Sequence, residues 1–167
     1  MVCMMGWRRQ PENILLASRE SDTDVKITDF GVAKRHHANL KTYCGTPQYL
    51  APEVLLGAAD LEFDYTSYTE KVDMWAAGLI LAEMAAGGPL FVVDSEIDLL
   101  FSIFRMLGTP DEESWPGLHD LACSIDNFPN WPVETRNLAQ TFSILGSSGC
   151  DLLKKLLRFV CFELHDT

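Results

Sequence analysis

Residues 70–86 read EKVDMWAAGLILAEMAA, which is the strongest helical pattern in the sequence. On a helix drawn through it, apolar side chains fall on almost every side, which is typical of a helix buried inside a larger helical body. Thr69 is placed to cap its first turn, and the run Gly87-Gly88-Pro89 is expected to end it. The sequence therefore predicts one long central helix that other elements cover.

Asp73 stands in the first turn of this predicted helix. A carboxylate in a buried position must have hydrogen-bond donors to satisfy it, which makes Asp73 a candidate structural residue. The alternative is a simple contact with the positive end of the helix dipole, without a further role.

A second helix is predicted over residues 96–107, where Ser95 can cap the start and Asp98 can complete a capping box. Gly108 and Pro110 are expected to end it. Residues 111–132, rich in Trp and Pro, predict an ordered but irregular connection, and residues 151–160 predict a last amphipathic helix. The apolar face expected for the second helix consists of Ile97, Leu100, Phe101, Phe104 and Leu107.

Two short apolar runs, residues 14–17 and 25–28, flank a polar turn and predict a β-hairpin. The segment that follows contains Gly31, Gly45, Pro47 and Pro52, and it predicts an extended surface loop. Two small strands and several helices together predict a mostly α (α+β) domain.

The chain has 167 residues, enough for one domain, and a net charge of −11. This charge argues against nucleic acid and anionic membranes as partners; it suits a basic substrate or simply reflects solvated surface. Five scattered cysteines without a C-x-x-C pair indicate free thiols in a reducing compartment. No apolar run is long enough for a signal peptide or a membrane span. We therefore expect a cytoplasmic or nuclear protein.

Five segments in order resemble eukaryotic-type Ser/Thr protein kinases over residues 11–159. They are PENILL (11–16), DFG (29–31), CGTPQYLAPE (44–53), VDMWAAG (72–78), and DSEID (94–98) with LGTPDE (107–112) and WPG (115–117). The fold that the resemblance implies is a truncated protein-kinase C-lobe with a small β-hairpin and a buried central helix. The tail is similar to cyclin-dependent kinases, whereas residues 42–47 resemble checkpoint-type or cyclic-nucleotide-dependent kinases.

The resemblance assigns roles to individual residues. Asn13 and Asp29 match the ligands of Mg²⁺, and their oxygen donors suit this hard cation. Leu15 matches the residue beneath the adenine of ATP, and Ile80 and Met84 would support it from below. As a structural alternative, these three residues are simply part of the core. The substrate-facing positions are Glu12, Gly45 and Thr46, and the Gly-Thr-Pro run implies Ser or Thr in a protein substrate.

The segment before Pro11 departs from the family pattern. Where the family has His-Arg-Asp-Leu-Lys, this chain has GWRRQ at residues 6–10, so Arg8 stands at the position of the catalytic aspartate. No Asp or Glu occurs in residues 1–10, and Gln10 replaces the phosphate-binding lysine. Loss of a general base costs roughly 10²- to 10⁴-fold in rate. We therefore expect no catalytic residue and no activity from this chain alone, and ATP and Mg²⁺ binding that is weak or absent.

Two regulatory or structural positions are also incomplete. Thr42 matches the activating phosphosite, with Lys34 as one cationic partner, but Trp7 replaces the usual arginine; alternatively, Thr42 is an ordinary loop threonine. Glu53 pairs in the family with a buried arginine, and residues 160–167 contain none. A buried carboxylate without this partner is expected to take up a proton or to cost several kcal/mol.

These features divide the chain into a divergent segment (1–10), a partial kinase domain (11–159) and a divergent tail (160–167). The preferred interpretation is a fragment of a Ser/Thr kinase whose family transfers phosphoryl groups from ATP to proteins. The alternatives are a pseudokinase-like module that binds partner proteins through residues 96–107 and the Trp/Pro segment, and a non-functional truncated product. Cyclin binding is not expected without the N-lobe. Apolar surface on the 70–86 helix is expected to stay uncovered.

Overall fold

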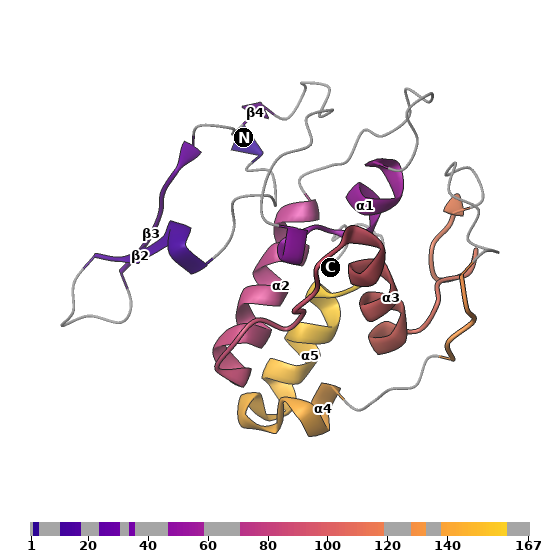
Figure 1. Cartoon of the computed structure of the whole chain (residues 1–167). Coiled ribbons are helices and arrows are strands. Elements are labelled where there is room, and N and C mark those ends of the chain that lie inside the picture. Colours follow the sequence, from indigo (N-terminus) through magenta and orange to yellow (C-terminus); the bar gives the residue numbers. More distant parts are fainter. Residues whose placement is uncertain are drawn as a thin grey trace, which may run out of the picture.

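The structure is a computed structural model that describes residues 2–3, 11–17, 24–30, 34–35, 47–58, 71–118, 128–132 and 138–159 (Figure 1). The described part is mostly helical, as the sequence predicted. Its helices are α1 (Pro52–Ala58), α2 (Lys71–Ala86), α3 (Glu96–Leu107), α4 (Leu138–Thr141) and α5 (Gly146–Leu156). Short 3₁₀ turns occur at Pro11–Asn13, Pro47–Tyr49 and Ser143–Leu145. Within these ranges, no helix combines the length and apolar character needed to cross a membrane.

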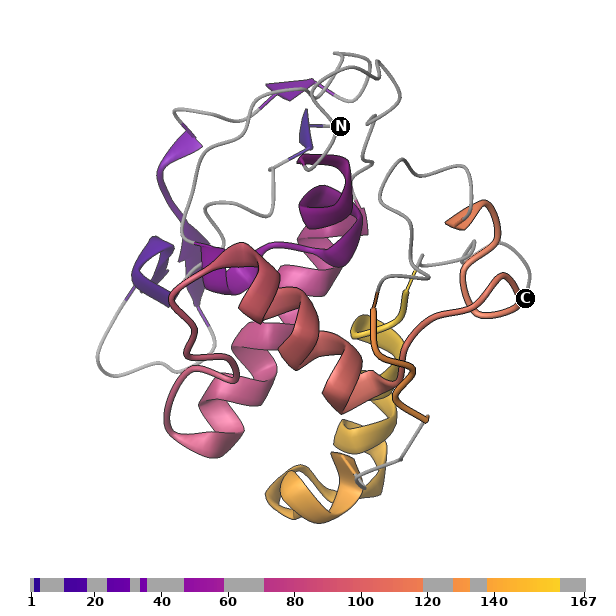
Figure 2. The ribbon, with the colours of Figure 1, turned by 45° about the vertical axis from the view of Figure 1, so that its right-hand side comes forward.

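The strands form two small antiparallel sheets. β2 (Ile14–Leu16) pairs with β3 (Val25–Ile27), which confirms the predicted hairpin. β1 (Val2–Cys3) pairs with β4 (Lys34–Arg35), a pairing that the sequence did not predict. Figures 1 and 2 show the hairpin to one side of the helices, with α2 between it and α5 in both views.

The central helix, α2, begins within one residue of the predicted start and ends where predicted. Its buried side includes Val72, Trp75 and Leu79, each at most 3 % exposed. Gly78 faces α5 at close range, because a Cβ atom there would lie 2.9 Å from the Cβ of Leu156. The two helices therefore approach through a position where a larger residue does not fit.

The end of α2 follows from glycine chemistry. Gly87 has a φ of 78°, a left-handed conformation that glycine adopts without a steric cost. Its N–H donates to the carbonyl oxygen of Glu83 at 2.8 Å, which satisfies one of the last carbonyls of the helix.

α3 has the predicted bounds but a different buried face. Its N-cap is Ser95, whose hydroxyl accepts from the N–H of Asp98 at 3.2 Å and donates to the Asp98 carboxylate at 2.5 Å. Ile97, placed on the apolar face by its spacing, is 47 % exposed. The buried set is instead Leu99, Leu100, Ile103 and Phe104. The buried face of α3 differs from the predicted one because α3 packs against α1 as well as against the aromatic segments. Tertiary contacts therefore determine which side of α3 is covered.

The segment after α3 is irregular and ordered in its described parts, 111–118 and 128–132. The indole ring of Trp115 stacks on the ring of Phe159, with centroids 5.8 Å apart. Phe128 meets Phe104 of α3 edge to face at 5.3 Å. Edge-to-face and stacked ring pairs add to the stabilisation that burial alone provides. Aromatic packing therefore holds this connection against α3 in place of secondary structure.

Two predictions about the chain's helices were wrong. Residues 47–58 are no extended surface loop: Leu50, Ala51 and Pro52 are buried, and α1 begins at Pro52. Proline suits the first position of a helix because its missing N–H has no partner there in any case. The last helix is α5, which begins at Gly146 and ends at Leu156 in place of the predicted 151–160.

Candidate functional site

The hairpin brings Asn13 and Asp29 to the same place. Ile14 pairs with Ile27, and one position beyond this pair the N–H of Thr28 donates to the carbonyl oxygen of Asn13 at 2.9 Å. Asp29 directly follows Thr28, so both candidate Mg²⁺ ligands stand at the open end of the hairpin, where the two strands leave the sheet. Asn13 and Asp29 are sixteen positions apart in the sequence, and the pairing of the two strands brings their backbones close together in space.

Asp29 has an unusual backbone conformation. Its φ is 61°, the only positive value among the described residues other than glycine. Such a conformation is sparsely populated in L-residues, costs on the order of 1–3 kcal/mol and clusters at functional sites. Aspartate tolerates it better than most residues. The side chain of Asp29 is exposed, so this backbone conformation presents the carboxylate at the surface and not in the core.

The donor atoms at this end of the hairpin fit Mg²⁺. The ion prefers oxygen ligands and is usually held by one or two side chains together with phosphate oxygens and water. Asn13 and Asp29 offer an amide and a carboxylate oxygen. Across the described residues, no group of three or more His, Cys, Asp or Glu side chains forms a self-sufficient metal cage. Two oxygen donors suit a metal that also binds phosphate oxygens and water.

The three residues expected around the adenine have different environments. Ile80 on α2 is buried, at 7 % exposed. Leu15 is 50 % exposed and Met84 is 70 % exposed, so the structural alternative, in which all three are core residues, is wrong for these two. Leu15 stands in β2, two residues after Asn13, which ends the preceding 3₁₀ turn. An apolar side chain is thus accessible beside the candidate metal ligands.

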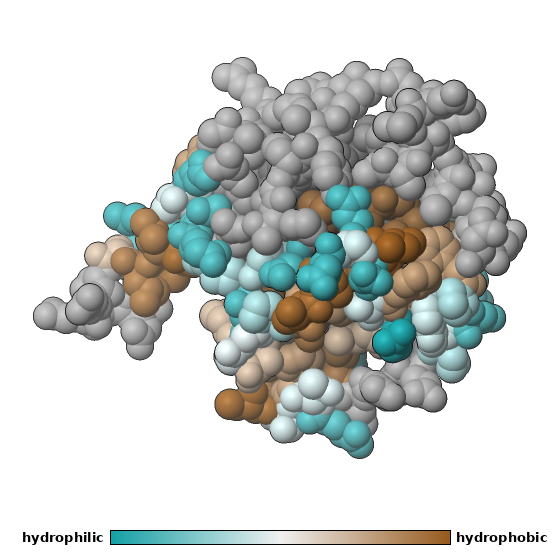
Figure 3. All heavy atoms as spheres, in the orientation of Figure 1, coloured by the Kyte–Doolittle hydropathy of each residue, from teal (hydrophilic) through white to brown (hydrophobic). Residues whose placement is uncertain are grey.

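The hairpin exposes further apolar surface. Leu16, Val25 and Phe30 are each at least 50 % exposed. In Figure 3 hydrophobic atoms gather on the hairpin where it stands away from the helices. On α2 itself, Met74 and Met84 are 40 % and 70 % exposed, which agrees with the expectation of uncovered apolar surface on this helix.

A hydrogen bond that the sequence did not reveal connects the segment before α1 to α2. The hydroxyl of Tyr49 donates to Oε2 of Glu83 at 2.7 Å. Burial, this hydrogen bond and the charges of Glu83 and Glu12 raise the pKa of Tyr49 well above its usual value. Glu83 thus contacts the phenol directly, and the charge of Glu12, at the start of the hairpin, acts on the same phenol. The only signal in the sequence was that Glu83 interrupts an apolar run.

The two structural carboxylates lie in helical first turns. Asp73 in α2 is buried, at 5 % exposed. Glu53 in α1 is partly buried, and desolvation raises its pKa to about 7; a backbone hydrogen bond and the positive charge of Lys71 lower the pKa only in part. Burial thus favours the neutral form of Glu53 near physiological pH.

Some predicted residues lie outside the described part of the chain. These are Arg8, Thr42, Gly45 and Thr46, and for Lys34 only the backbone strand is described. Within the docking face suggested for residues 96–107 and the Trp/Pro segment, Phe104 and Trp115 are 0 % and 4 % exposed, so these two side chains belong to the core.

The comparison with known families agrees with the five motifs. The family described as "Protein kinase domain" matches residues 10–162. The match includes the hairpin with Asn13 and Asp29, the Tyr49–Glu83 pair and all five helices. Because the match extends over more than half of the chain, this chain belongs to the protein kinase domain family.

Proposed function

We propose that this chain is the larger part of the C-terminal lobe of a Ser/Thr protein kinase, with residues 11–159 as the partial domain between divergent segments 1–10 and 160–167. Protein kinases generally use ATP and Mg²⁺ and act on protein substrates. The observation that carries the proposal is the hairpin register, which places Asn13 and Asp29 together at one edge. The motifs further support a tail of cyclin-dependent type and an activation segment of checkpoint type.

Each residue at the open end of the hairpin has a proposed role. Mg²⁺, when bound with ATP, neutralises phosphate charge during phosphoryl transfer. Asn13 and Asp29 would hold the metal through their side-chain oxygens. The accessible Leu15 would lie beneath the base, and Ile80 would support the floor from α2. These residues bind and orient the nucleotide; none of them is in the position of a proton acceptor.

The acidic group around Tyr49 supports a basic protein substrate. Glu12 and Glu83 lie near the same phenol, and Glu12 is exposed. Glu12 also belongs, with Gly45 and Thr46, to the positions proposed to face the substrate. The exposed carboxylate of Glu12 attracts an arginine or lysine side chain, and an overall charge of −11 steers basic peptides in the same direction.

Catalysis by this chain alone is not part of the proposal. Arg8 occupies the place of the proton-accepting aspartate, and Gln10 that of the phosphate-binding lysine. Loss of the base costs roughly 10²- to 10⁴-fold, and loss of the phosphate clamp adds to this. Phosphorylation of Thr42 would order its loop only weakly, because Trp7 replaces a cationic partner.

The test is Mg²⁺-dependent ATP binding by the full chain, measured as a thermal shift. We expect a shift with ATP and Mg²⁺ together that Asp29→Asn abolishes. Asp24→Asn is the matched control, because it makes the same charge change at an exposed position of the same hairpin, and it should keep the shift. No shift in the wild type, or an equal shift in both variants, would contradict the proposed site.

A further inference from the structure

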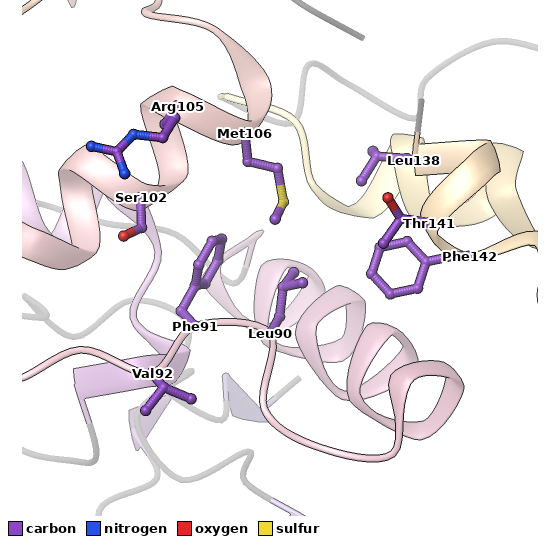
Figure 4. A pocket seen from close by; sticks show the side chains of 9 residues that line it. All are labelled: Leu90, Phe91, Val92, Ser102, Arg105, Met106, Leu138, Thr141 and Phe142. Atoms are coloured by element: carbon purple, nitrogen blue, oxygen red, sulfur yellow. The ribbon is translucent and has the colours of Figure 1, made fainter. Parts of the chain in front are cut away.

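A cavity of about 390 Å³ opens between three segments away from the hairpin. Its lining residues come from the loop after α2, from α3, and from α4 with the residue that follows it (Figure 4). The hairpin, the 3₁₀ turn at Pro47–Tyr49 and α1 contribute nothing to this lining. The cavity is therefore separate from the proposed kinase site, and its size is in the lower part of the range for small-molecule pockets, about 300–1,000 Å³.

The middle of the cavity is lined by apolar side chains. Leu90, Met106 and Leu138 line it as partly buried side chains, and the more deeply buried rings of Phe91 and Phe142 lie beside them. Figure 4 shows Ser102 and Arg105 at one end and Thr141 and Phe142 at the other, with Phe91 and Met106 in the middle. A flexible thioether adapts its shape to a ligand more readily than a branched side chain does. This middle part suits a narrow hydrocarbon chain.

The polar end has unused hydrogen-bond donors. Within the described ranges, the side chains of Ser102 and Arg105 have no hydrogen bond or ion pair. The guanidinium of Arg105 lies 5.7 Å from the centroid of the Trp131 ring. A contact through the face of the guanidinium holds the side chain in place, while its N–H groups, which lie in its plane, remain able to donate. Arginine also stays charged at every accessible pH.

We propose that this cavity binds a medium-chain fatty acid. The carboxylate accepts hydrogen bonds from Arg105 and Ser102, and the hydrocarbon chain lies between Leu90, Met106 and Leu138. A carboxylate matches the fork of donors on arginine, and this charged pair explains why an anion is preferred to a neutral lipid. The modest volume selects a single short chain over a phospholipid.

The probe is decanoate, titrated into the full chain below the concentration at which it forms micelles, with heat as the readout. Arg105→Gln is expected to weaken binding by about 10- to 100-fold, the range for a hydrogen bond to a charged group. Arg158→Gln is the matched control: it removes an equally exposed positive charge at a residue outside the cavity lining and should bind as the wild type does.

Two further comparisons make the result decisive. Decanol, the neutral analogue, should bind the wild type more weakly than decanoate by a similar factor, and this comparison needs no variant. Ser102→Phe fills the cavity and should abolish binding. Absence of decanoate binding, equal affinity for decanoate and decanol, or unchanged binding in Arg105→Gln or Ser102→Phe would overturn the proposal.

Discussion

Replacing Glu53 with glutamine should stabilise the protein at high pH and leave its stability nearly unchanged at low pH. Burial raises the pKa of Glu53 from 4.5 to about 7, so the folded state binds its proton more tightly than the unfolded chain does. Stability from this group is therefore fully present below pH 4.5 and is lost as the pH rises through 7. At about 1.4 kcal/mol per pH unit, the loss amounts to roughly 3 kcal/mol.

Urea unfolding at pH 5 and pH 8 measures this effect. Glutamine keeps the shape of the protonated acid and cannot ionise, so Glu53→Gln should exceed the wild type by up to about 3 kcal/mol at pH 8, and match it within about 1 kcal/mol at pH 5. Glu113→Gln, at an exposed position, serves as the control and should change little at either pH. A loss of stability in Glu53→Gln that is the same at both pH values would rule out a raised pKa of Glu53, because it would show that the ionised carboxylate has a favourable partner.

Three other substitutions test the packing around α2 and α3. Gly78→Ala should destabilise the protein by about 1–3 kcal/mol in urea unfolding, because its Cβ would lie 2.9 Å from side chains at the end of α5. Gly88→Ala is the control: there is open space around Gly88, so the stability should hardly change. Tyr49→Phe removes the hydrogen bond to Glu83 and should cost about 1.5–3 kcal/mol; a double-mutant cycle with Glu83→Gln should show a coupling energy, and additive effects would count against the pair. Thr109→Val removes two hydrogen bonds to the segment 129–131 and should lower the free energy of unfolding in urea by about 1–3 kcal/mol. An unchanged free energy would mean that the aromatic contacts alone hold the segment.

Local signals in the sequence were enough to predict the hairpin, α2 and α3. Each of these elements has a strong pattern and clear end signals, such as Ser95 before α3 and Gly87 after α2. α1 was missed because Pro52 was interpreted as a breaker, although proline is also common at the first position of a helix. The start of α5 was missed because Gly146 and Gly149 look like loop residues, and only packing against α2 makes a helix there favourable.

Only those residues of the candidate site that belong to a sequence motif could be predicted. Asn13 and Asp29 stand in recognisable motifs, one just before and one just after the predicted hairpin. The Tyr49–Glu83 hydrogen bond joins residues 34 positions apart, and no local pattern reports a contact at that separation. The buried face of α3 shows the same limit, because Ile97 and Leu99 are equally apolar and only the neighbouring elements decide which of them is covered.

The most direct test of the account is a radiolabelled phosphoryl-transfer assay with the full chain, ATP, Mg²⁺ and a basic Ser/Thr peptide. If Asn13 and Asp29 help to bind the nucleotide but no residue accepts the proton, the wild type should transfer no more phosphate than Asp29→Ala does. Turnover in the wild type that Asp29→Ala abolishes would contradict the account, because some group of this chain would then be accepting the proton of the substrate hydroxyl.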